Sequence, residues 1–207
     1  MNIYLIRHTV PDVLPGICYG QADLGLADSF AAELRSIQAK LAHITSPVLV
    51  SSPLRRCSML AESLAQHFDA PVVNKDVRLM ELNFGDWELK RWADIPQGVV
   101  SKWSDKHIRQ GPPNGESYVE LHARAKEFFI ELTSKEHEHV LVFTHAGVIR
   151  ALIAEISGMP LTAAANIQVD YGSVTHVVVE NGVTRLERID RKSTRLNSSH
   201  VKRSRMP

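Results

Sequence analysis

Short apolar runs alternate with helical apolar stripes along most of the chain. Four segments consist almost entirely of apolar residues, which is typical of strands covered on both faces of a sheet. The predicted strands are residues 2–6, 48–52, 70–75 and 139–145. Between them, apolar residues recur every three or four positions, as on the buried face of a helix. This alternation predicts an α/β fold with a mainly parallel sheet and right-handed crossovers.

The predicted helices have recognisable ends. The first begins near Asp28, and the second is expected to have Ser52 as its N-cap and Pro53 at its first position. SYVE (117–120) has the pattern of a capping box, with Ser at the cap and Glu three residues later. The next predicted helix follows a strand directly and ends at Gly158.

Two stretches depart from this alternation. Residues 76–115 contain three Trp with several Pro and Gly and have no sustained period, which predicts either a poorly ordered insertion or a lid over a site. Further on, Asn181 and Gly182 indicate a hairpin turn between two final strands. Residues 191–207 hold six basic residues and no acidic one, and we interpret them as a disordered or non-native tail. We therefore assign residues 1–190 to one domain.

The composition is that of an ordinary globular protein, with 44% hydrophobic and 23% charged residues in a chain of 207. Because no apolar run approaches the roughly 20 residues of a membrane helix and no secretion signal is recognisable, we expect a cytoplasmic protein without a membrane partner. Without the basic tail, 18 basic and 23 acidic residues remain, a balance that disfavours nucleic-acid binding. Two cysteines, Cys18 and Cys57, are too few for a disulfide framework or a zinc site.

Polar side chains that bear chemistry follow the predicted strands. Ligands of open α/β sheets bind beyond the carboxyl ends of the strands. Arg7 and His8 follow the first strand, and His145 ends the fourth. Arg55 and Arg56 lie at the start of the second helix, where the macrodipole disfavours cations unless an anion is nearby. Helical spacing places Arg56 beside the buried stripe and Arg55 toward water, so we expect Arg56 to face the ligand.

These side chains predict a phosphate pocket that works without a metal or another cofactor. Arginine forks match phosphoryl oxygens and stabilise the charge that develops during transfer. A neutral imidazole can attack phosphorus to form a phosphohistidine, and neighbouring cations favour the neutral ring. The leaving alcohol needs a proton donor, for which Glu81 is our candidate because its apolar neighbours favour the protonated form. The same carboxylate can then activate water, with Asp86 and Glu88 as rivals.

Five segments, in order, resemble motifs of the histidine phosphatase (phosphoglycerate mutase-like) superfamily. The segments are LIRHT (5–9), SSPLRRC (51–57), MELNFGDWE (80–88), PNGES (113–117) and FTHAGVIR (143–150). The resemblance implies a three-layer α/β/α sandwich that hydrolyses a small phosphomonoester. It implies His8 as the phosphorylated nucleophile and Glu81 as the proton donor. The implied phosphate ligands are Arg7, Arg56 and His145.

Some positions depart from the family motifs. Thr9 and Leu89 stand where glycine is usual, Cys57 replaces alanine, and Leu14 replaces a frequent asparagine. None of these changes removes a catalytic atom. They affect the loop expected to contact the substrate.

That loop, RHTVPDVLPGICYGQADLGL (7–26), resembles the α-ribazole phosphatases of cobalamin biosynthesis. Those enzymes remove a phosphate from α-ribazole 5′-phosphate or the corresponding cobalamin phosphate. The resemblance implies substrate contacts from Thr9 and from a turn of Tyr19, Gly20 and Gln21, although a purely structural glycine turn is an alternative.

Other functions share the same pocket. A cofactor-dependent phosphoglycerate mutase is the nearest, but a body of about 190 residues leaves little room for the insertions of those mutases. A broad-specificity phosphatase or a fructose-2,6-bisphosphatase-like enzyme fits the core equally well. A non-catalytic binder of phosphorylated ligands is a further alternative, which the retention of His8 and Glu81 disfavours.

Overall fold

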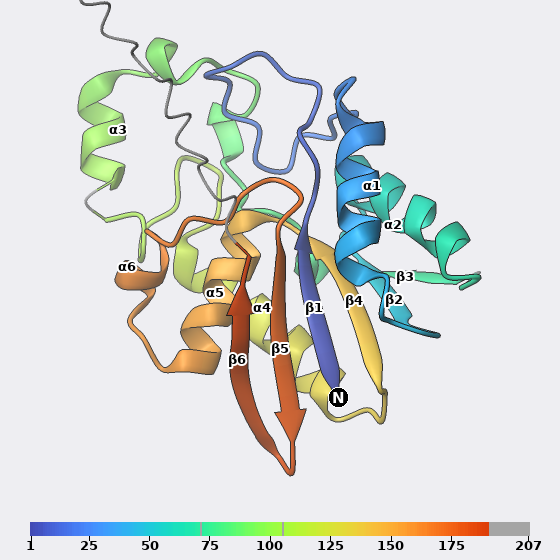
Figure 1. The fold of residues 1–207 in the computed structure, drawn as a ribbon. Helices are drawn as coiled ribbons and strands as arrows, with labels where there is room; N and C mark the ends of the chain where they lie inside the picture. The colour runs from blue at the N-terminus through green and yellow to red at the C-terminus, as the bar shows by residue number, and fades with distance from the viewer. Residues whose placement is uncertain (71, 105, 191–207) are drawn as a thin grey trace, which may run out of the picture.

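The computed structural model describes residues 1–70, 72–104 and 106–190, and the prediction for residues 191–207 lies outside this part. Six strands form one mixed sheet in the order β3-β2-β4-β1-β5-β6 (Figure 1). The strands are β1 (Asn2–Arg7), β2 (Val48–Ser51), β3 (Val73–Lys75), β4 (His139–Thr144), β5 (Val174–Glu180) and β6 (Val183–Ile189). The first four in chain order are parallel, whereas β5 and β6 are antiparallel to their neighbours.

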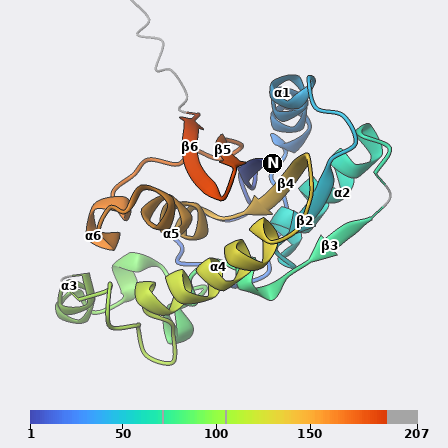
Figure 2. The same cartoon turned by 90° about the horizontal axis from the view of Figure 1, so that it is seen from below.

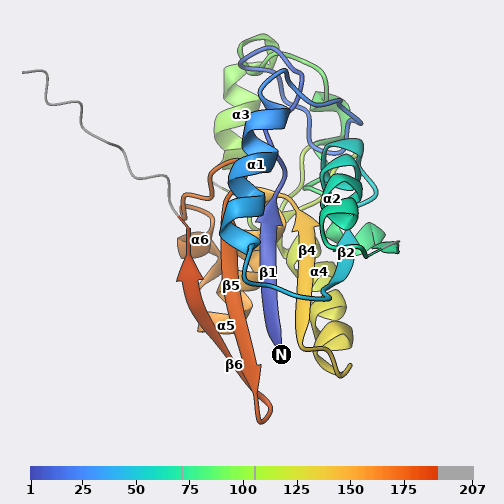
Figure 3. The same cartoon turned by 45° about the vertical axis from the view of Figure 1, so that its right-hand side comes forward.

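Helices cover both faces of the sheet and give three layers (Figures 2 and 3). The helices are α1 (Phe30–Leu41), α2 (Arg55–His67), α3 (Gln97–Ser104), α4 (Tyr118–Thr133), α5 (Ala146–Ser157) and α6 (Leu161–Ala164). Side chains alternate along β1, so Tyr4 and Ile6 pack with α1 and α2. Ile3 and Leu5 pack with α4 and α5 on the opposite face. The predicted three-layer α/β/α sandwich is confirmed. No helix in the described ranges is long and apolar enough to cross a membrane.

Several predicted ends are confirmed. Ser117 and Glu120 form both hydrogen bonds of a capping box at the start of α4. Gly158 ends α5 with φ of 67°, a left-handed conformation that glycine adopts without strain. Asn181 and Gly182 both have positive φ between β5 and β6, as a tight hairpin with the twist of its strands requires.

The predicted cap of α2 is wrong. The helix begins at Arg55, with extended Leu54 as N-cap and no side-chain cap. Ser52 still belongs to the sheet pairing, since its N–H donates to the carbonyl oxygen of Phe143 at 2.9 Å, and two residues separate it from the helix. Pro53 therefore lies in the bend between β2 and α2 rather than in the first helical turn.

The irregular stretch 76–115 is ordered around its own small core. It contains α3 and the 3-10 turns η1 (Val77–Leu79), η2 (Gly85–Trp87) and η3 (Trp92–Asp94). Trp87, Trp92 and Trp103 contact one another at ring-centroid distances of 5.3 to 6.3 Å. The helices and turns of this stretch do not fit the alternative of a poorly ordered insertion. The helix α3 lies toward the end of the sheet where β1 and β4 end (Figure 1), and a lid over the site stays a prediction. The helix α3 was not predicted.

The α2 contact with the sheet can be tested by cavity formation. Leu64 has no exposed surface and lies in the core between α2 and the sheet. We predict that Leu64→Ala lowers the free energy of unfolding by roughly 2–5 kcal/mol, measured by urea denaturation. Met59→Ala on the exposed side of the same helix is the control, expected to change it by less than about 0.5 kcal/mol. Equal effects of the two substitutions would contradict this packing.

Candidate active site

The parallel pairing of β1 with β4 brings His8 and His145 together. The register pairs Arg7 with Thr144, so the next residue of each strand emerges at the same edge of the sheet. The N–H of His8 donates to the carbonyl oxygen of Thr144 at 3.0 Å, and the two imidazole centroids are 5.1 Å apart. Two histidines far apart in sequence therefore share one site.

The His8 imidazole has a defined proton position. Its Nδ1 lies 2.7 Å from the carbonyl oxygen of Thr9. Because a carbonyl oxygen only accepts, Nδ1 carries the hydrogen, and in the neutral ring the lone pair is on Nε2. Burial lowers the pKa of His8 well below its usual value, and the positive charges of Arg56 and Arg7 add to this effect. The ring is therefore neutral near pH 7, with Nε2 available as a nucleophile.

Two guanidinium groups lie beside His8 without a carboxylate partner. Arg56 is fully buried and donates to the carbonyl oxygens of Gly20 and Ala22, whereas Arg55 is exposed. Arg7 donates to the carbonyl oxygen of Val169 at 2.6 Å. Within the described part of the chain, neither Arg7 nor Arg56 forms an ion pair, and the Nε of each lacks a hydrogen-bond partner. Since burying an uncompensated charge is unfavourable, this pair indicates an anionic ligand.

Tyr171 joins these groups and was missed by the sequence analysis. The Arg7 guanidinium carbon lies 3.6 Å from the Tyr171 ring centroid, a cation-π contact. The Tyr171 hydroxyl is 2.8 Å from that of Tyr19, and its ring is 5.4 Å from His8. The signal that was available is topological: β5 runs antiparallel to β1, so the residues before β5 lie at the edge where β1 ends.

His145 is held by the segment after β2. Its Nε2 lies 2.9 Å from the Ser52 hydroxyl oxygen and 3.4 Å from Sγ of Cys57. Burial lowers the pKa of His145 well below its usual value, with Arg56 as the next cause. Cys57, which departs from the family alanine, thus contacts a predicted phosphate ligand, and burial raises the pKa of its thiol. Ser52, expected as a helix cap, contacts this ring instead.

The Glu81 carboxylate lies at the start of α5. One of its oxygens accepts the N–H of Leu82 at 2.9 Å, and the other accepts the N–H of Gly147 at 3.3 Å. A Cβ at Gly147 would overlap the carboxylate, which explains the glycine at this position. The rivals lie elsewhere: Glu88 accepts backbone N–H groups of the neighbouring loops, and exposed Asp86 accepts from the side chain of Asn114.

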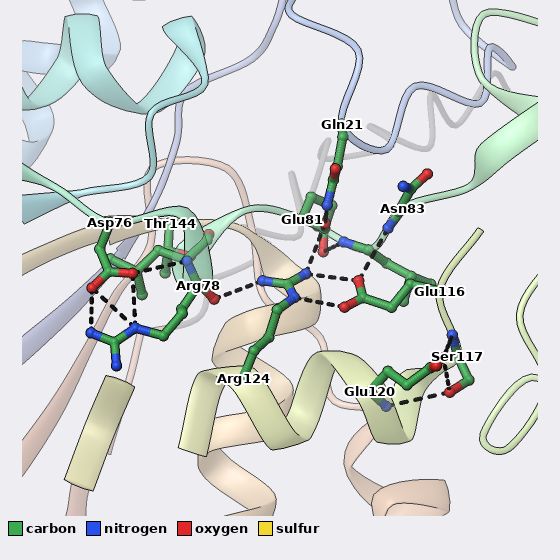
Figure 4. A network of polar contacts seen from close by, with 12 residues as sticks. Gln21, Asp76, Arg78, Glu81, Asn83, Glu116, Ser117, Glu120, Arg124 and Thr144 are labelled. Atoms are coloured by element: carbon green, nitrogen blue, oxygen red, sulfur yellow. Dashed lines mark hydrogen bonds and ion pairs between the residues drawn. The ribbon is translucent and has the colours of Figure 1, made fainter. Parts of the chain in front are cut away.

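Side chains, rather than a strand ladder, hold the segment that carries Glu81 (Figure 4). The carbonyl oxygen of Glu81 accepts from Arg124 at 3.0 Å and from the side-chain amide of Gln21 at 2.9 Å. Arg124 also donates to the carbonyl oxygen of Arg78 at 2.6 Å. Thr144, next to His145, donates to the carbonyl oxygen of Leu79 in the same segment. The backbone at Glu81 is therefore fixed relative to the end of β4.

Arg124 is itself fixed by Glu116. The guanidinium donates to both carboxylate oxygens, at 2.7 and 2.8 Å, and Glu116 also accepts the N–H of Asn83 (Figure 4). Such two-point pairs combine charge with a defined orientation. In the sequence, Glu116 stands out only as part of the PNGES motif, and no pattern indicates Arg124.

The predicted loop residues contact the same centre. Gly20 has φ of 34°, and a Cβ there would clash with the Glu88 carboxylate and the carbonyl oxygen of Leu82, so this turn requires glycine. The Tyr19 ring lies 5.2 Å from the Arg56 guanidinium carbon. Thr9 is buried, and its hydroxyl has no hydrogen-bond partner among the described residues. With Gln21 bound to the backbone of Glu81, the structure brings all nine predicted site residues together.

Known proteins resemble this chain over most of its length. Residues 3–192 match the family described as the histidine phosphatase superfamily (branch 1). An adenosylcobalamin/alpha-ribazole phosphatase of Escherichia coli is 28% identical over 177 residues, covering 83% of this chain and 87% of that protein. A glucosyl-3-phosphoglycerate phosphatase of Mycolicibacterium vanbaalenii is 29% identical over 172 residues, covering 77% and 76%.

Solved structures agree with this match. The crystal structure of the alpha-ribazole phosphatase from Shigella flexneri superposes with a TM-score of 0.84 at 25% identity, covering 91% of this chain and 96% of that one. The family match spans nearly all of the described residues. The chain belongs to the histidine phosphatase superfamily and is a phosphomonoester hydrolase.

Proposed function

We propose that this histidine phosphatase hydrolyses α-ribazole 5′-phosphate through a phosphohistidine at His8. The observation that carries the reaction is the Nε2 lone pair of His8 beside the uncompensated guanidinium groups of Arg7 and Arg56. The substrate is supported by the loop 7–26 and by relatives named adenosylcobalamin/alpha-ribazole phosphatase.

The first step transfers the phosphoryl group to the enzyme. Nε2 of His8 attacks phosphorus while the bond from phosphorus to the alcohol oxygen breaks. Glu81 donates its proton to the departing oxygen, so the alcohol leaves neutral. Arg7, Arg56 and His145 donate hydrogen bonds to the phosphoryl oxygens and stabilise the transition state.

The second step returns the enzyme to its starting state. The Glu81 carboxylate takes a proton from water, whose oxygen attacks the phosphohistidine, and the bond between Nε2 and phosphorus breaks. Inorganic phosphate leaves, His8 is again neutral and Glu81 is again protonated. Tyr19, Gly20 and Gln21 lie against the phosphate or the sugar, because they contact Arg56 and the backbone of Glu81. Thr9, whose carbonyl oxygen contacts the His8 ring, borders the same place.

The substrate assignment is tested by comparing kcat/KM across a panel of phosphomonoesters, each measured with and without EDTA. The panel contains α-ribazole 5′-phosphate, 3-phosphoglycerate, fructose 2,6-bisphosphate, phosphoserine and p-nitrophenyl phosphate. We expect the highest kcat/KM for α-ribazole 5′-phosphate and no loss of rate with EDTA. A higher kcat/KM for a phosphoglycerate or a sugar phosphate would contradict the assignment of α-ribazole 5′-phosphate as the substrate. Inhibition by EDTA would refute metal independence.

The nucleophile is tested by trapping. Wild-type protein mixed rapidly with ³²P-labelled substrate should hold an acid-labile, alkali-stable label, as expected of a phosphohistidine. His8→Ala should lose both the label and turnover because no other group replaces Nε2. His122→Ala is the control, since His122 pairs with Glu155 on the α4–α5 surface and should retain both. Labelling of His8→Ala at the wild-type level would contradict the assignment of His8 as the nucleophile.

The proton donor is tested through the leaving group. Glu81→Gln should lower kcat/KM for α-ribazole 5′-phosphate by roughly 10²–10⁴-fold. It should lower kcat/KM for p-nitrophenyl phosphate much less, because nitrophenolate leaves without a proton. Asp86→Asn removes a carboxylate from the same segment and should leave both values near wild type. If Glu81→Gln slows both substrates equally, Glu81 is not the acid.

A further inference from the structure

A cavity of about 190 Å³ has Glu81 in its lining, which does not include His8 or His145. Its lining is mostly apolar and aromatic, and includes Leu82 and Ala165. Phe84, Trp103 and Tyr118 supply aromatic walls from the acid segment, from α3 and from the start of α4. These rings and the segment around Glu81 enclose a space that the mechanism above does not use.

The rings around the cavity form a continuous series. Phe84 lies edge to face with Trp103 at a centroid distance of 5.9 Å. Trp103 is followed by His107 at 5.4 Å, and His107 by Tyr118 at 6.5 Å. Aromatic rings in such tilted contacts stay in defined orientations, so the wall presents faces and edges to whatever occupies the cavity.

The cavity is continuous with the catalytic end of the site. Glu81 and Gly147 belong to its lining, and the N–H of Gly147 donates to the Glu81 carboxylate. The Tyr118 hydroxyl donates to the carbonyl oxygen of Gly147 at 3.3 Å, which ties the aromatic wall to the start of α5. A substrate whose leaving oxygen faces Glu81 therefore has its alcohol part next to these rings.

The lining favours a flat aromatic group over a bare sugar. Sugar hydroxyls need hydrogen-bond partners, which the side chains of Leu82, Phe84 and Ala165 do not supply. The charged groups of the lining are Glu81 and Arg150, and the Nε–H of Arg150 donates to the carbonyl oxygen of Ile167. The buried indole N–H of Trp103 has no hydrogen-bond partner among the described residues, and a ring nitrogen would supply an acceptor. Stacking on aromatic side chains is a general means of holding heterocyclic bases.

We propose that this cavity binds a planar heteroaromatic ring carried by the alcohol part of the substrate. In α-ribazole 5′-phosphate that ring is the benzimidazole, so the inference rests on the proposed function and adds the residues that select the base. Phe84 and Trp103 are then specificity-determining residues, and they act on the leaving group rather than on the phosphoryl group.

The test compares two substrates with the same 5′-phosphoester, α-ribazole 5′-phosphate and ribose 5-phosphate, which lacks the base. The measured quantity is the ratio of their kcat/KM values, which does not depend on the folded fraction of a variant. Wild type should favour α-ribazole 5′-phosphate. Phe84→Leu and Trp103→Leu keep an apolar side chain but remove the ring, and each should lower the ratio on the order of ten-fold, mainly through KM.

Trp92→Leu is the matched control. Trp92 contacts both Phe84 and Trp103 in the small core of residues 76–115 but does not line the cavity, so its loss should leave the ratio unchanged. Efficient hydrolysis of α-ribazole 5′-phosphate with unchanged ratios in Phe84→Leu and Trp103→Leu would overturn the inference and leave the proposed function standing. Failure of wild type to hydrolyse α-ribazole 5′-phosphate would overturn both.

Discussion

The hydrogen bond from Nδ1 of His8 to the carbonyl oxygen of Thr9 determines which nitrogen of the ring can react. A carbonyl oxygen has no proton to give, so the bond holds the hydrogen on Nδ1 and leaves the lone pair on Nε2. Burial and the charge of Arg56 lower the pKa of His8 and keep the ring neutral, whereas the hydrogen bond to Thr9 by itself raises that pKa. The parallel register of β1 and β4 then places the His145 ring beside the His8 ring, with the centroids 5.1 Å apart.

A second constraint concerns Glu81, the proposed proton donor, which lies on no strand. The segment around Glu81 satisfies its backbone groups through Arg124, Gln21 and Thr144, and Arg124 is oriented in turn by Glu116. Fully satisfied polar networks in a low dielectric are rigid, so a segment without regular structure can still hold a carboxylate in one place. Because Thr144 precedes His145 and the Glu81 carboxylate accepts from Gly147, Glu81 and the proposed phosphate ligand His145 lie together where β4 ends and α5 begins.

Local sequence patterns predicted the parts of this site that local rules govern. Apolar strands precede Arg7, His8 and His145. Ligands of open α/β sheets bind beyond the carboxyl ends of the strands, and this rule is sufficient to predict that these three residues share a site. Tyr171 was missed because the strand after it is antiparallel to β1, and the neighbour of a strand is not encoded in its own pattern. Ser52 was misplaced as a cap because its pairing with β4 is a long-range contact that overrides a local preference. The link between Arg124 and the acid segment is also long-range, and no spacing signals it.

The most direct test of the account is ¹⁵N NMR of imidazole-labelled protein, before and after phosphorylation. In the free enzyme, the His8 signals should show a hydrogen on Nδ1 and none on Nε2. This neutral form should persist at pH values below the usual imidazole pKa of about 6.5. In the phosphorylated enzyme, phosphorus should couple to Nε2. Phosphorus on Nδ1, or a free ring with its hydrogen on Nε2, would contradict the assignment of the nucleophile.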